Sequence, residues 1–67
     1  MKTVKELIAT NIATAEVDII TVNNNGKLTQ YDSVESLVYC EGDSIVTDYE
    51  IEYDSDEGLV YLDLEVE

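Results

Sequence analysis

The chain has 67 residues, of which 16 are acidic and only 3 are lysine or arginine, so its formal net charge is −13. Direct binding to nucleic-acid phosphates or to an anionic membrane surface depends on Lys and Arg, and this composition argues against both. The partner that such a charge favours is a basic protein.

Residues 3–12, with the sequence TVKELIATNI, are predicted to form a short helix. Thr3 and Glu6 have the spacing of a capping box, in which each side chain bonds the backbone N–H of the other residue. Val4, Leu7 and Ile8 fall on one side of such a helix. Because a helix this short is marginal alone, we expect it to pack against a sheet.

Residues 16–32, EVDIITVNNNGKLTQYD, are predicted to form a β-hairpin. The first half is rich in β-branched residues, and Asn25-Gly26 is the preferred pair for a tight primed turn. Which side of the first strand faces the core stays open. Val17 and Ile19 point to one face, whereas Ile20 and Val22 point to the other.

Residues 32–44, DSVESLVYCEGDS, allow two interpretations. Asp32 and Glu35 have capping spacing, and the apolar residues that follow them fit one face of a short helix. Alternatively, SLVYC is a strand and EGD is the turn after it. Gly42 ends the element in either case, and whether residues 33–41 are helix or strand is left open.

Residues 45–67 are predicted to form a second hairpin, because apolar and acidic residues alternate on both sides of a Gly-containing turn. We expect Tyr49, Ile51, Leu62 and Leu64 to be buried beneath the acidic face. The predicted fold class is α+β within one domain, residues 1–67. It is a small antiparallel sheet of about four strands in two hairpins, with an N-terminal helix and a possible second helix on one face.

The alternation predicts two neighbouring rows of carboxylates on the second hairpin. Same-face residues lie about 6.6–6.8 Å apart along a strand, so two rows supply roughly one charge per 3.4 Å. Duplex DNA carries one per about 1.7 Å, so the ribbon is about half as dense. Two interpretations remain: an acidic face that only keeps the chain in solution, and a site for a basic partner. The candidate partner-binding residues are Asp48, Glu50, Glu52, Asp54, Asp56, Glu57, Tyr61, Asp63 and Glu65.

The DSDEG segment invites a comparison with calcium-binding loops. Asp54 and Asp56 have the right step, but Gly58 falls at the fifth position instead of the sixth, and no long loop follows. A hairpin turn explains the segment better, so we predict no metal site. A weak divalent-ion binder remains a third, minor hypothesis.

Residues suited to catalysis are scarce. The chain has no histidine, and its single cysteine, Cys40, therefore lacks the partner that would activate a thiolate. The glycines fall in predicted turns and not in a phosphate-binding loop. We therefore expect no enzyme and no cofactor. One cysteine, no apolar run typical of a signal peptide and no stretch of membrane-spanning length favour a reducing, cytoplasmic setting.

The opening TVKELI, the AEVDI segment and the NNNGK turn resemble a loose group of small phage and prophage proteins. These begin with a short helix, continue with a Gly-containing hairpin and end with a strand pair. The resemblance covers the first 30 residues and implies no residue-level role. Small acidic phage proteins include inhibitors of host enzymes and of defence nucleases such as CRISPR effectors, and some of them mimic DNA.

Two main hypotheses follow. The first is a non-enzymatic acidic inhibitor or modulator whose carboxylate ribbon occupies a basic nucleic-acid-binding surface of a host or defence protein. The second is a small structural module or homodimer that uses an edge strand or the apolar side of its sheet, with an acidic face that is merely solvated.

Overall fold

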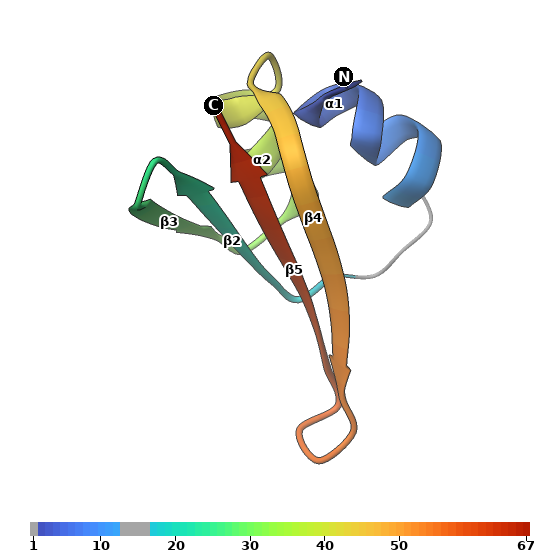
Figure 1. Cartoon of the computed structure of the whole chain (residues 1–67). Coiled ribbons are helices and arrows are strands. Elements are labelled where there is room, and N and C mark those ends of the chain that lie inside the picture. The colour runs from blue at the N-terminus through green and yellow to red at the C-terminus, as the bar shows by residue number, and fades with distance from the viewer. Residues whose placement is uncertain (1, 13–16) are drawn as a thin grey trace.

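The computed structural model describes residues 2–12 and 17–67, and the side chains of all of these except 11 and 12 (Figure 1). It contains one mixed sheet with the strand order β1-β4-β5-β2-β3 and helices on one face. The elements in chain order are β1 (Lys2–Thr3), α1 (Val4–Leu7), the π-helical turn η1 (Ile8–Ile12), β2 (Ile19–Asn24), β3 (Lys27–Tyr31), α2 (Val34–Glu41), β4 (Ile45–Asp54) and β5 (Leu59–Val66).

The predicted α+β class is confirmed, but the prediction of about four antiparallel strands is wrong. A fifth strand, β1, pairs with β4 at Ile45 and Val46. The two predicted hairpins are joined through β2 and β5, which run parallel. Apolar alternation indicates which residues face the core, but it does not indicate which strand edges meet, and therefore it could not reveal the parallel pairing.

The N-terminal helix begins as predicted. The Thr3 hydroxyl accepts the Glu6 N–H at 3.3 Å, and the Glu6 carboxylate accepts the Thr3 N–H at 3.1 Å. The hydrogen bond from the Thr3 N–H, and then one that the Thr3 hydroxyl donates to the same carboxylate at 2.9 Å, lower the pKa of Glu6. Val4, Leu7 and Ile8 are buried on the side that faces the sheet, so the amphipathic spacing read from the sequence is confirmed.

The segment that allowed two interpretations is helix α2. Its N-cap is Ser33, whose hydroxyl accepts the Ser36 N–H at 3.1 Å, so the capping role expected of Asp32 is wrong by one residue. Gly42 ends the helix as predicted. A Cβ at this glycine would overlap the carbonyl oxygen of Val38, so the chain passes too close to the helix for a side chain.

The first hairpin turns at Asn25 and Gly26, which both have positive φ, as the primed turn requires. The open question about β2 is resolved in favour of Ile20 and Val22, which are buried in the core. The core combines one face of the sheet with both helices: Val4, Leu7, Ile8, Ile20, Val22, Leu37, Leu62, Leu64 and Val66.

The second hairpin contains a β-bulge that the sequence analysis missed. The register slips between Val46, which pairs with Val66, and Asp48, which pairs with Glu65. The extra residue, Thr47, donates its hydroxyl to the Glu65 carbonyl at 3.2 Å. Because a bulge adds one residue to one strand, Val46 and Tyr49 can share a face although they are three residues apart.

The expectation that Tyr49 and Ile51 are buried is wrong. Their β5 partners, Leu64 and Leu62, are 1% and 0% exposed, yet Tyr49 and Ile51 are 39% and 44% exposed. Tyr53, nearer the turn, is 67% exposed. The turn end of the β4–β5 hairpin projects well past the helices (Figure 1). Val46, at the start of β4, still packs against the core, whereas Ile51 and Tyr53 lie farther along the strand, where less of the chain covers them.

Candidate functional site

The register of β4 and β5 collects the late carboxylates on one face of the sheet. Residues directly opposite in an antiparallel pair point to the same side. The opposed pairs are Asp48 with Glu65, Glu50 with Asp63, and Glu52 with Tyr61. We call these six residues the acidic face; its five carboxylates are all exposed.

The acidic face lies on the side of the sheet away from the helices. The buried residues Leu62 and Leu64 alternate with Asp63 and point to the helices. Next to β5, strand β2 continues the face with Thr21 beside Asp63 and with Asn23 beside Glu65. These two residues of β2 therefore add no charge to the acidic face.

The three lysines lie outside β4 and β5, although Lys2 borders the same hollow as Asp48. Lys2 is in β1, and Lys5 in α1 forms a salt bridge with Asp43 at 3.0 Å. Lys27 pairs with Asn24, which alternation places on the same face as Ile20 and Val22. The acidic face likewise does not include Glu35, which is on helix α2, or Asp43, which follows that helix.

Crowding within the acidic face alters the pKa of one carboxyl group. Hydrogen bonding to the Glu50 carboxyl, and then the negative charge of Glu50, raise the pKa of Glu52. Burial and Asp63 add smaller contributions in the same direction. Glu50 and Glu52 are two residues apart on β4, so the shift reflects crowding of carboxylates along one strand.

Asp54, a predicted site residue, stabilises the turn instead of extending the charged surface. Its carboxylate accepts the N–H of Asp56 at 3.0 Å and of Glu57 at 3.3 Å. Its carbonyl accepts the N–H of Gly58, which has φ +70, at 2.7 Å. Asp56 and Glu57 are exposed in this turn. Within residues 2–12 and 17–67, no group of three or more acidic or cysteine side chains could hold a metal ion.

Tyr61 lies among the carboxylates, as alternation predicts, but it is only half-exposed. It stands opposite Glu52 and beside Ile19 of β2, and its hydroxyl donates to Glu57 at 3.5 Å. Partial removal from water, and then the charge of Glu57, raise the pKa of Tyr61. A ring held in this way offers one side and not its whole surface to a partner.

A second surface feature escaped the sequence analysis. Tyr49, Ile51 and Tyr53 form a partly exposed apolar strip on the helix side of β4. A signal was present in the residue types, because β5 has Leu62 and Leu64 at the positions facing the core whereas β4 has two tyrosines. Tyrosine suits a position between the core and water better than leucine does, because its ring is apolar and its hydroxyl is polar.

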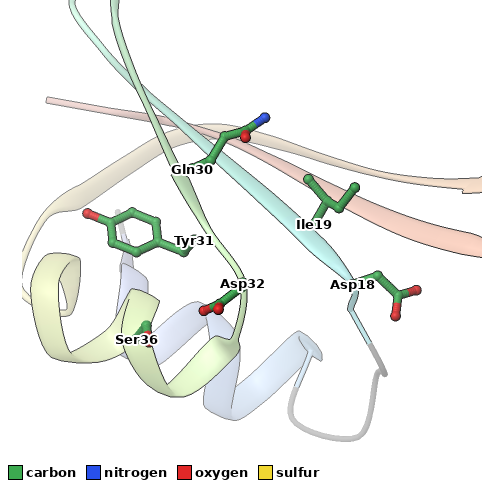
Figure 2. A pocket seen from close by; sticks show the side chains of 6 residues that line it. All are labelled: Asp18, Ile19, Gln30, Tyr31, Asp32 and Ser36. Carbon is green, nitrogen blue, oxygen red and sulfur yellow. The ribbon is translucent and has the colours of Figure 1, made fainter.

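An open hollow lies where β2 and β3 meet helix α2. Figure 2 shows Gln30 and Tyr31 on opposite sides of the β3 ribbon, and Asp18 pointing away from both. The Tyr31 hydroxyl donates to Glu41 at 2.9 Å, and removal from water, followed by this contact, raises the pKa of Tyr31 to about 12. The side chains of Gln30, Tyr31 and Asp18 therefore point in different directions.

Comparisons with protein-family models, curated proteins and solved structures gave no match for this chain. In the part of the chain that the structure describes, no helix has both the length and the apolar character needed to cross a membrane.

Proposed function

We propose that this protein is a non-enzymatic modulator that binds a basic protein through its acidic face. The observation that supports the proposal is the gathering of five exposed carboxylates on two paired strands that contain no lysine. A Lys/Arg-lined surface that normally binds nucleic acid has the complementary charge.

The acidic face carries a cost that a basic partner would relieve. Like charges directly opposite on a sheet destabilise it, and Glu50 faces Asp63 in this way. Hydrogen bonding to Glu50, and then the charge of Glu50, raise the pKa of Glu52, which indicates crowding of carboxylates on the same face. Lysine or arginine side chains placed between the carboxylate rows would convert repulsion into attraction, and this supports a binding role over a merely solvated face.

The partner that we propose is a nucleic-acid-binding host or defence protein, in line with the resemblance of the N-terminal part to small phage proteins. With two rows of carboxylates, the face has roughly one charge per 3.4 Å of ribbon. It would therefore imitate one side of a charged backbone and not the full density of duplex DNA.

A structural homodimer is the second candidate, and the exposed Ile51 and Tyr53 favour it. Charge argues against it. Pairing β4 with β4 of a second copy would bring Asp48, Glu50 and Glu52 beside more carboxylates, with no lysine in the strand to offset them.

A charge-reversal experiment tests the proposal. Wild-type protein, Glu50→Lys/Glu52→Lys and the control Asp32→Lys/Glu35→Lys are immobilised and exposed to bacterial lysate, and captured proteins are identified by mass spectrometry. Both variants change the net charge equally. We expect wild type and control to capture nucleic-acid-binding proteins that duplex DNA or high salt releases, because exposed charge pairs are screened.

The acidic-face variant should lose this set of captured proteins while its NMR spectrum shows the fold retained. Capture of the same proteins by the acidic-face variant, or their retention in the presence of excess DNA, would contradict the proposal.

A further inference from the structure

The outer edge of β4 is open over most of its length. On one side β4 pairs with β5 from Val46 to Asp54. On the other side, among the described residues, it pairs only with β1, at Ile45 and Val46. An unpaired strand edge is a template for another strand.

The backbone orientation identifies which groups face this edge. The Asp54 carbonyl accepts the Gly58 N–H within the hairpin, so the peptide groups of Asp54 face β5. In an antiparallel strand, alternate residues direct their N–H and C=O groups to alternate edges. The peptide groups of Ile51 and Tyr53 therefore face the open edge. The Tyr49 N–H is already bound, to the Asp48 carboxylate at 2.9 Å, so the available edge begins after it.

The two faces beside this edge differ in chemistry. On the helix side, Ile51 is 44% exposed and Tyr53 is 67% exposed. On the other side lie the exposed carboxylates of Glu50 and Glu52. A strand lying beside β4 would place its successive side chains alternately against the apolar strip and against the carboxylates.

We propose that β4 binds an extended segment of its partner as an added antiparallel strand, in which basic side chains lie over Glu50 and Glu52 and apolar side chains pack on Ile51 and Tyr53. The inference rests on the proposed function and specifies its partner as a segment with alternating basic and apolar residues. The antiparallel direction continues that of β1, which occupies the same edge.

Charge complementarity selects this occupant over the alternatives. A second copy paired at this edge would place its own β4 carboxylates beside those of the first copy, and the like charges would repel. The other edge strand, β3, is shorter and bears Lys27. A basic segment would meet a like charge there, so we expect it to pair with β4 instead. Main-chain hydrogen bonds would supply affinity, and the alternating side chains would supply specificity.

The test uses a synthetic heptapeptide of alternating lysine and valine with the full-length protein. In antiparallel pairing, the valines lie opposite Ile51 and Tyr53 and their N–H groups face β4, whereas the lysine N–H groups face away. One peptide is N-methylated at two of its valines and a matched peptide at two internal lysines. The two modified peptides therefore have the same charge and composition.

We expect the unmodified and lysine-methylated peptides to slow amide hydrogen exchange at Ile51 and Tyr53 and not in β3. Methylation at the valines should weaken binding by about tenfold or more, since it removes at least two hydrogen bonds. Replacing the strip, as Ile51→Thr/Tyr53→Thr, should weaken binding of the unmodified peptide, whereas the matched change Leu28→Thr on β3 should not.

Three results would overturn the inference. Equal binding of all three peptides would mean purely electrostatic contact. Loss of binding only on lysine methylation would contradict the proposed arrangement. Sedimentation as a dimer with protected Ile51 and Tyr53 amides and no peptide would make a second copy the occupant. The lysate experiment can succeed in the first two cases, so the proposed function can survive when strand addition fails.

Discussion

Glu50 lies directly opposite Asp63 in the β4–β5 ladder, and both carboxylates are exposed on the face that the helices leave uncovered. Two like charges at this spacing destabilise the sheet, and the same juxtaposition forms the centre of the proposed binding surface.

Replacing Asp63 with lysine should stabilise the protein. Asp63→Lys converts an opposed pair of like charges into an ion pair, and the free energy of unfolding should rise by about 0.5 kcal/mol at low salt. Urea denaturation at low and high salt measures this change. Asp63→Asn, the control, should give a smaller gain, and a loss of stability in Asp63→Lys would contradict the repulsion argument.

Glu52 should titrate above the ordinary range of a glutamate, because the Glu50 carboxyl raises its pKa. The folded state then binds protons more tightly than the unfolded state. This contribution to stability is present at low pH and is lost as pH rises through the raised pKa. NMR titration of the side-chain carboxyl carbons measures the shift.

Glu50→Gln should return the Glu52 pKa toward its ordinary value, because an amide carries no charge. The control Glu35→Gln, on helix α2, should leave the Glu52 titration unchanged. An unaltered Glu52 pKa in Glu50→Gln would exclude Glu50 as the cause.

Tyr31 should lose its proton late, at a pKa of about 12, because it is shielded from water and donates to Glu41. The folded state keeps this proton after the unfolded state has lost it, so stability falls as pH rises from about 10 toward 12. Ultraviolet absorbance measures tyrosinate formation. Tyr31→Phe should remove this late component, and the exposed-residue control Tyr39→Phe should retain it.

Ile51 and Leu62 are directly opposite each other, yet their truncation should have unequal effects on stability. Leu62 is 0% exposed, and Leu62→Ala should cost about 2–5 kcal/mol, enough to unfold much of a 67-residue domain. Ile51 is 44% exposed, so Ile51→Ala should cost about 1 kcal/mol or less. Thermal unfolding followed by circular dichroism compares them. Equal losses would show that Ile51 is buried in solution, as a dimer would require.

The local elements could be predicted because their signals lie within a few residues. The Thr3 and Glu6 side chains reach each other within one helical turn, and Asn25-Gly26 adopts the positive φ values of its turn without distant contacts. The two acidic rows also follow from local alternation, since strand geometry alone sends Glu50 and Glu52 to the same side.

The tertiary structure decided the rest. The parallel pairing of β2 with β5, the short strand β1 and the burial of Ile20 in preference to Ile19 all depend on which edges meet, and residues far apart in the chain determine this. Exposure of Ile51 and Tyr53 likewise depends on how far the helices extend over the hairpin. A local pattern indicates which residues can be buried. Only the packed chain determines which of them are covered by other residues and so removed from water.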